Sequence, residues 1–222
     1  IIDDNTDQVV VQSKTLLSSA MTQSVQNTEI RGGYGNKLLY DWSYQKDLQF
    51  TLEDAAWREE YIAMNNGTGI LAGLAEFYNN DEPVVLSNGS GQLAETPIGN
   101  VYVKRPDGKF ITVTPSGKNI TVPGLTNETV FVTYRYEANI NRIVINADEY
   151  PTAYRLVLKT KIVAQTGKIA DVEIVVPRYK ISGNMEITFG AAEPATSSLE
   201  GKAMAWTDPD TGEDVYAYVN IK

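Results

Sequence analysis

The chain has 222 residues, 42% of them hydrophobic, and a formal net charge of −9 at pH 7. It contains no cysteine and no histidine, which excludes disulfides, zinc–thiolate sites, cysteine nucleophiles and the Ser–His–Asp arrangement of many hydrolases. The acidic balance disfavours a protein that wraps nucleic-acid phosphates, and no apolar run is long enough for a membrane span.

The N-terminal region opens with an acidic, unpatterned segment, residues 1–7, which we expect to be a loose arm. Residues 15–30 are rich in Ser, Thr, Gln and Asn and alternate only weakly. A strand this polar has little reason to pair within a monomer core. We therefore expect an edge strand or loop that becomes ordered against a neighbouring subunit.

The next stretch combines a glycine-rich loop with a strand. Downstream of the loop, Leu48, Phe50 and Leu52 alternate with polar residues, which is the period of a strand with one buried face. The loop lacks the Gly-Lys-Ser/Thr ending of a phosphate-binding loop, and no helix follows it directly. We interpret it as a mobile loop between subunits, formed by Arg31, Gly32, Gly33, Tyr34, Gly35 and Asn36.

A short amphipathic helix is predicted over about residues 53–64, because Trp57, Tyr61 and Met64 recur at helical spacing. The segment 51–54 resembles a capping box, with Asp in place of the usual Glu. Asn-Gly at 66–67 suits a left-handed helix stop. We interpret the aromatic side chains of this helix as core residues rather than a binding platform.

Two further β-segments follow the helix. Residues 69–78 are predicted to form a second long strand, and residues 79–83 a turn. A hairpin is then predicted around the loop 106–108, which ends in glycine. Its register places Val103 opposite Ile111 and Val101 opposite Val113.

The clearest hairpin is predicted between Tyr154 and Val176, around the three-residue loop 165–167. One of its faces is apolar and the other carries opposite-charge pairs. A slip by one residue would oppose Ile162 to Asp171, so the register is well specified. The predicted pairs are Val163–Ile169, Ile162–Ala170, Lys161–Asp171, Lys159–Glu173, Leu158–Ile174 and Leu156–Val176.

The C-terminal region continues the β pattern. Pro177 is expected to end the hairpin strand, and further strands are predicted at 180–189, 201–206 and 215–221, with a loop at 208–214. About ten strand candidates stand against one convincing helix, so the fold class is mainly β.

The order of these elements resembles the major tail tube proteins of long-tailed bacteriophages. The resemblance runs from the glycine-rich loop and its Leu-Leu-Tyr strand, through the helix and a β-insert, to the Thr-Gly-Lys hairpin. It covers about residues 10–221 and continues in three short motifs, Val175–Ile181, Met185–Phe189 and Glu193–Thr196. The order of the segments carries more weight than any single motif.

The resemblance implies a tail-tube-type β-sandwich or half-barrel protomer with one flanking helix. Residues 1–94 and 151–222 would form this domain. Residues 95–150 would form a β-rich insertion similar to small immunoglobulin-like units. Six protomers would join their long strands into a β-barrel ring, and rings would stack into a tube through which the genome leaves the capsid.

The same resemblance implies a non-enzymatic virion protein without a cofactor, assembled in the cytoplasm of the bacterial host. Its partners would be copies of itself, the tape measure, terminator and baseplate proteins and, in a contractile tail, a sheath protein. DNA would pass through transiently and without sequence specificity. No membrane insertion by this chain is expected.

A conduit for DNA favours carboxylates that face inward and repel phosphates. The strands on either side of the predicted helix offer four candidates, and the resemblance leads us to expect an electronegative channel. Each of these residues can also be read as an ordinary solvated charge. The candidates are Asp41, Asp47, Glu53 and Glu76.

Other readings remain open from the sequence alone. The acidic loop 208–214 partly echoes a calcium loop, but no bidentate Glu follows at the expected distance. The neighbouring acids Glu59–Glu60 and Asp148–Glu149 do not supply two carboxylates across a cleft, as a glycosidase needs. A head decoration protein, a baseplate or terminator ring subunit, a pilus-like subunit and a carbohydrate-binding β-sandwich are the alternatives from other classes.

Overall fold

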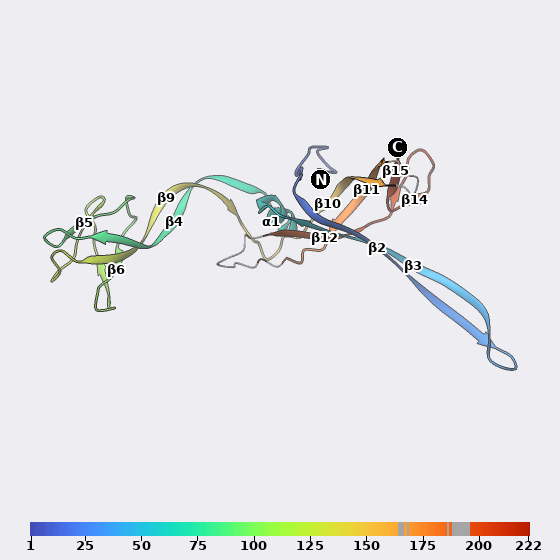
Figure 1. The fold of residues 1–222 in the computed structure, drawn as a ribbon, viewed down its shortest axis with the longest axis horizontal. Helices are drawn as coiled ribbons and strands as arrows, with labels where there is room; N and C mark the ends of the chain where they lie inside the picture. Colours follow the sequence, from blue (N-terminus) through green and yellow to red (C-terminus); the bar gives the residue numbers. More distant parts are fainter. Residues whose placement is uncertain (164–166, 168, 186, 188–195) are drawn as a thin grey trace. The chain divides into compact units, whose positions relative to one another are not determined.

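The structure, a computed structural model, describes residues 1–163, 167, 169–185, 187 and 196–222. It divides into two compact units, which are treated separately below. Unit 1 comprises Ile1–Ile70 and Ile143–Lys222, and unit 2 comprises Leu71–Arg142. Strands dominate both units and the described part of the chain has one helix, which confirms the prediction of a mainly β fold (Figure 1).

Unit 1 is built on a seven-stranded antiparallel sheet with the strand order β1-β10-β11-β12-β3-β2, in which β15 also pairs with β11. A separate two-stranded sheet joins β13 and β14. The elements are β1 (Ile2–Asp3), β2 (Leu16–Gly32), β3 (Lys37–Asp54), α1 (Glu59–Asn66), β10 (Ala153–Val163), β11 (Ile169–Ile181), β12 (Ser197–Ala203), β13 (Trp206–Thr207), β14 (Asp214–Val215) and β15 (Tyr218–Ile221).

The core of unit 1 lies between one face of this sheet and α1. Phe50 of β3 meets the ring of Tyr179 edge-on, with 6.1 Å between ring centroids. A Cβ atom on Gly201 would come within 2.6 Å of that Tyr179 ring, so the close strand approach requires glycine. The remaining large core side chains come from β3, α1, β10, β11 and β12: Leu48, Leu52, Tyr61, Met64, Leu156, Val176, Ile181 and Leu199.

Unit 2 has a four-stranded sheet, β4-β9-β6-β7, and a two-stranded sheet, β5-β8. Its core is entirely apolar apart from tyrosine hydroxyls, and Val101, Val103, Val130 and Val132 are fully buried. The strands are β4 (Ile70–Val85), β5 (Ser90–Gln92), β6 (Val101–Lys104), β7 (Phe110–Val113), β8 (Asn119–Thr121) and β9 (Thr129–Ile143).

Both predicted hairpin registers are confirmed. In unit 2, Val103 lies opposite Ile111 and Val101 opposite Val113, with Gly108 at φ 82° in the turn. In unit 1, the six pairs predicted between β10 and β11 all occur. The loop predicted at 165–167 lies, except for Gly167, outside the described residues.

The helix differs from its prediction at the N-terminal end. It begins at Glu59 rather than 53, because β3 continues through Asp54 while paired with β12 on one side and β2 on the other. The predicted capping box is wrong, since Arg58 occupies the N-cap position without a side-chain cap. The predicted stop is confirmed, because Gly67 is left-handed at φ 67°.

Several local predictions are also wrong. Residues 1–7 are not a loose arm, because β1 pairs with β10 and Arg155 forms ion pairs with Asp4 and Asp7. Residues 79–83 lie inside β4 rather than in a turn, with Asp81 taking a positive φ of 53° within the strand. Strand β11 runs through Pro177 and ends at Ile181, and residues 182–185 are not strand.

Candidate functional site

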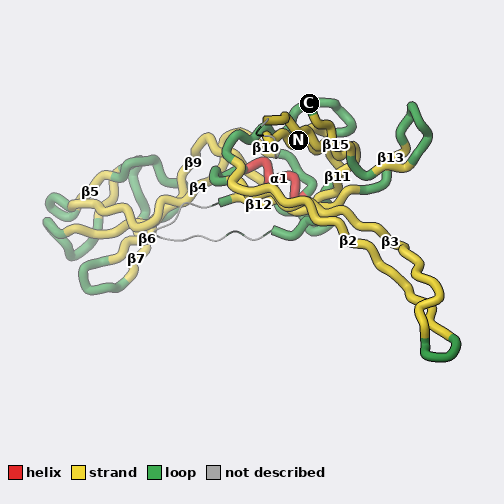
Figure 2. The backbone as a smooth tube through the Cα atoms, turned by 45° about the vertical axis from the view of Figure 1, so that its right-hand side comes forward, coloured by secondary structure: helices red, strands yellow, loops and turns green. Residues whose placement is uncertain are grey.

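The β2–β3 pair forms a long two-stranded ribbon that runs out from the rest of unit 1 (Figures 1 and 2). Strand β3 pairs with β12 only over residues 49–54, so the remainder of β3 has β2 as its sole partner in the described sheet. Strand β2 is an edge strand of 17 residues, and every one except Gly32 is exposed. A row of unpaired backbone groups along an edge of this length is a template for pairing with another chain.

The glycine-rich segment lies at the tip of this ribbon. Gly33 and Gly35 take positive φ angles of 74° and 86°, which favour glycine, and Asn36 donates its backbone N–H to the Gly33 carbonyl at 3.1 Å. Arg31 forms an ion pair with Glu29 at 2.7 Å on the exposed strand. The Tyr34 side chain is fully exposed, so the tip presents an aromatic ring to its surroundings.

The two faces of the ribbon exchange character at a bulge. Gln45 has a φ of 50°, and the pairing steps from Val25–Lys46 to Gln26–Tyr44, so β3 carries one extra residue there. Strand β2 has no extra residue at this step, so its side chains alternate between the two faces without interruption. The β2 partner of each residue therefore tells which face that residue of β3 lies on. On the core side of the bulge, the apolar residues of β3 face the unit 1 core. Beyond the bulge, Tyr40, Trp42 and Tyr44 face the opposite way.

This change of phase creates an aromatic row on the distal ribbon. Tyr40, Trp42 and Tyr44 share one face, and they are 61%, 64% and 45% exposed. The face is the one turned away from the unit 1 core, so that core cannot extend to cover the rings. Exposed aromatic side chains in a row are typical of surfaces that become buried in an interface.

The four acidic candidates do not share one face. Asp47 pairs with Ser24 and Glu53 with Ser18, which places both carboxylates on the ribbon face opposite the core. Asp41 pairs directly with Glu29 and lies on the other face.

The fourth candidate belongs to another unit. Glu76 lies on β4 of unit 2, and its carboxylate accepts a hydrogen bond from Arg135 at 2.8 Å. The register therefore places Asp47 and Glu53 on one ribbon face, while Asp41 lies on the other face and Glu76 in the other unit.

A buried carboxylate fixes the base of the ribbon. Asp54 is fully buried and accepts hydrogen bonds from the hydroxyls of Ser13 and Thr15, both at 2.5 Å, and from the Ala56 N–H at 3.0 Å. The Arg58 guanidinium adds an ion pair at 3.2 Å. Burial by itself would raise the pKa of Asp54, but these hydrogen bonds outweigh it and lower the pKa to about 2.

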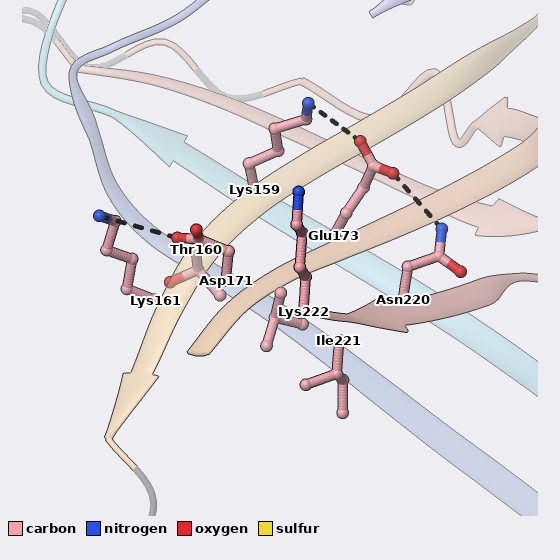
Figure 3. Close-up of a pocket in the computed structure, with 9 residues that line it drawn as sticks. Lys159, Thr160, Lys161, Asp171, Glu173, Asn220, Ile221 and Lys222 are labelled. Carbon is pink, nitrogen blue, oxygen red and sulfur yellow. Dashed lines mark hydrogen bonds and ion pairs between the residues drawn. The ribbon is translucent and has the colours of Figure 1, made fainter. Parts of the chain in front are cut away.

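A groove of about 490 Å³ lies over β10, β11 and β15 of unit 1 (Figure 3). Lys159 forms an ion pair with Glu173 at 3.0 Å, and the hydrogen bond from this lysine holds the pKa of Glu173 below its usual range. Lys161 and Asp171 lie 3.7 Å apart. These are the cross-strand pairs that the register predicts, and their charges neutralise one another. These ion pairs therefore stabilise the sheet, and the described residues of the groove include no nucleophile or base activated by a neighbour.

The acidic loop near the C-terminus uses its carboxylates internally. The Tyr218 hydroxyl donates to Asp208 at 2.7 Å, which lowers the pKa of Asp208 and raises that of Tyr218 to about 12. Asp214 accepts a hydrogen bond from Thr207 at 2.7 Å. Within the described ranges, no group of three or more acidic side chains converges in a way that could hold a metal ion. The helix that the structure describes is too short to cross a membrane.

The aromatic row is the feature that sequence reasoning missed. Its signal was present, because Tyr40, Trp42 and Tyr44 alternate with polar residues as a strand face does. In the sequence this alternation is in phase with Leu48, Phe50 and Leu52, so it predicts one shared face, and only the bulge at Gln45 turns the two sets to opposite faces.

Comparison with known proteins places these features in a family. A family model described as the YomU/Tube protein family matches residues 1–219. The chain is 24% identical over 202 residues to the "Tail tube protein" of Bacillus phage SPR, which covers 87% of the chain and 76% of that protein. It is 26% identical over 143 residues to the "SPbeta prophage-derived uncharacterized protein YomU" of Bacillus subtilis (strain 168). That match covers 63% of the chain and 54% of YomU, so the aligned part spans about half the length of this relative.

Proposed function

The chain belongs to the YomU/Tube protein family, and on this premise we propose how it assembles. It is a structural protein of a phage tail tube and so a component of the virion. Six copies close into a ring by pairing their open strand edges, and rings stack into a tube for genome passage. The observation that carries the proposal is the β2–β3 ribbon, with its unpaired edge and its uncovered aromatic row.

Edge pairing between copies removes the exposed backbone groups that a monomer leaves along β2. The aromatic row and the tip 31–36 then pack on a neighbouring copy, which buries Tyr40, Trp42 and Tyr44. Burial of each ring contributes on the order of 1.5–3 kcal/mol relative to exposure.

The aromatic row shares its ribbon face with Asp47 and Glu53, but it lies beyond the bulge. The part of this face on the core side of the bulge, which carries Asp47 and Glu53, is the best candidate for the lumen. It holds two carboxylates among small polar side chains, and it has no cation among the residues of β3 that flank them on that face. Such a surface repels DNA phosphates and keeps the passing genome from sticking. Asp41 and Glu76 are second choices for this role, because Asp41 lies on the other face of the ribbon and Arg135 neutralises Glu76.

The remaining parts of the proposal follow from the role of a tube. Tape measure, terminator and baseplate proteins, with a sheath protein if the tail contracts, contact its ends or surface, and assembly takes place in the bacterial cytoplasm. The protein acts without catalysis. Residues 95–150 as an immunoglobulin-like insertion are part of the same proposal.

Electron microscopy of the purified protein tests the assembly. We expect hollow stacked rings for the natural sequence, and isolated subunits for a variant that combines Trp42→Ser and Tyr44→Ser. Phe110→Ser in unit 2, an equally exposed ring, serves as the matched control and should assemble normally. A natural chain that stays monomeric at every concentration, or ribbon variants that assemble as well as the control, would overturn the proposal.

The lumen assignment has its own test. Asp47→Lys combined with Glu53→Lys should leave rings intact if these side chains face an open channel, while tubes retain DNA that the natural tubes release. Asp41→Lys with Glu29→Lys, on the other ribbon face, is the matched control. Retention of DNA by the control pair alone would assign the lumen to the opposite face.

A further inference from the structure

The core-facing side of the unit 1 sheet continues past the core at the end formed by β10, β11 and β15. Two rows of side chains cross these three strands on that side, as the pairing shows. In the inner row, Leu158 and Ile174 still pack against the unit 1 core, so the surface is continuous with it. We call the two rows, with the next residue on the same side of β10, the open apolar face: Leu158, Ile174 and Val219, then Thr160, Val172 and Ile221, then Ile162.

The outer part of the open apolar face is uncovered. Ile162, Val219 and Ile221 are 43%, 53% and 66% exposed. The ion pair between Lys159 and Glu173 lies on the other side of these strands, and the Ile221 side chain points away from it (Figure 3). The open apolar face itself contains no charged residue. A contiguous apolar surface of this kind is typical of the centre of an interface between proteins.

The distal ribbon offers a second uncharged surface. Across the aromatic row, Tyr44 pairs with Gln26, Trp42 with Thr28 and Tyr40 with Ile30. The partners on β2 are thus one apolar and two uncharged polar side chains, and they are all exposed. Two such sheet faces can pack on one another without removing an ion from water, which is the main cost of burying a polar surface.

The aromatic row cannot cover the open apolar face of its own chain. Both belong to one sheet, but the row lies on the side turned away from the core, and the open apolar face lies on the core side. Strand β2 is also at one edge of the sheet, whereas β10 is near the other. Two surfaces on opposite sides of a sheet can meet only between different copies.

We propose that the aromatic row of one copy packs face to face on the open apolar face of a second copy. Each copy carries one surface of each kind, so the contact is heterologous and repeats from copy to copy, as a ring or a stack requires. This inference rests on the proposed tube and names the surface that receives the ribbon.

Substitutions in the open apolar face test the contact by its effect on assembly. Ile221→Ser and Val219→Ser should each raise the protein concentration at which tubes form by about tenfold or more, the factor expected for one buried aliphatic side chain. Ile145→Ser is the matched control, because Ile145 is 65% exposed in unit 1 and lies outside this face. Equal effects of Ile221→Ser and Ile145→Ser would overturn the inference.

Cross-linking tests the pairing of the two surfaces directly, because the chain has no cysteine of its own. Thr28→Cys combined with Thr160→Cys places one thiol on each surface and keeps every apolar side chain. A thiol cross-linker about 10 Å long, the spacing of packed sheets, should give a ladder of dimers, trimers and larger species from assembled tubes. Each cysteine alone should give monomers. Asn27→Cys with Lys161→Cys, the adjacent residues on the opposite sides of the same strands, is the matched control and should also give monomers.

The outcomes separate this inference from the proposed tube. Tubes that form without the ladder, or an equal ladder from the control pair, would overturn the inference and leave the tube standing. Dimers from Thr160→Cys alone would show that two open apolar faces meet each other, which also overturns it. A chain that forms no tubes would overturn the proposed function and this inference together.

Discussion

The two compact units differ in how far each completes its own burial. Unit 2 encloses an apolar core within its four-stranded and two-stranded sheets. Unit 1 has a core of similar composition but extends β2 and β3 beyond it as a ribbon with no cover in the described structure. In the proposed ring, this difference makes unit 2 a body folded around its own core, whereas unit 1 is completed by other copies.

Charge follows the same division. Unit 1 has thirteen Lys and Arg against twenty-one Asp and Glu, and unit 2 has six against seven. Nearly all of the net charge of −9 therefore belongs to the unit that carries the ribbon. A protein that repels DNA from its inner surface needs its carboxylates on the unit that forms that surface. With six cations against seven carboxylates, unit 2 is nearly neutral.

The largest expected effect on stability comes from a substitution that creates a cavity in the core of unit 1. Phe50→Ala removes a fully buried ring that packs edge-on against Tyr179, and it should cost about 3–5 kcal/mol of the free energy of unfolding of unit 1. Because the two cores share no residues, hydrogen exchange should show protection lost throughout β3, β11 and β12 while β6 and β9 stay protected. Simultaneous loss of protection in unit 2 would show that the units unfold as one body.

Sequence reasoning succeeded where structure is set by near neighbours. The registers of both hairpins follow from alternation and from a loop glycine, as Gly108 illustrates. The helix stop at Gly67 has the same local origin, and a Cβ atom there would also collide with the Tyr150 carbonyl. The position of the glycine-rich loop between two strands could likewise be predicted from the sequence.

Sequence reasoning failed where segments that are distant in the sequence determine the local structure. Nothing near Asp54 announces that Ser13, Thr15 and β12 hold it in a strand, so the spacing of Trp57, Tyr61 and Met64 was extended too far back as helix. The acidic candidates were chosen from their strands without knowledge of the bulge at Gln45, which decides the face on which Asp41 lies. A bulge is one extra residue, and periodicity on either side of it gives no warning.

A smaller effect on stability, which also compares the two units, is expected when the pH is lowered. The folded-state pKa of Asp54 is about 2, below the ordinary value of 3.8 that applies in the unfolded chain, so the ionised form stabilises the fold. This contribution, about 2 kcal/mol, is fully present above pH 3.8 and is lost as the pH falls towards 2. We expect unit 1 to lose stability in that window before unit 2 does.

Chemical denaturation followed between pH 2 and pH 6 measures this contribution. The difference in free energy of unfolding between the natural chain and Asp54→Asn should be about 2 kcal/mol at pH 6 and should shrink towards zero near pH 2. Glu53→Gln, an exposed neighbour on the same strand, is the matched control. A difference that does not change with pH would mean that the hydrogen bonds to Asp54 do not require its charge.

The smallest of these effects belongs to unit 2. The buried Tyr134 hydroxyl donates to Glu82 at 2.6 Å and accepts from the Glu95 N–H at 3.1 Å, and burial and the bond to Glu82 raise its pKa. The Asn79 side-chain amide also donates to this hydroxyl, at 3.1 Å. Tyr134→Phe leaves all three partners without that contact and should cost about 1–2 kcal/mol. Because the network joins β9 to β4 within unit 2, exchange should accelerate in β4 and β9 and not in unit 1, and tubes should still form. Loss of tubes in this variant would show that unit 2 helps to hold the ring, and the contrast between the two units would then fail.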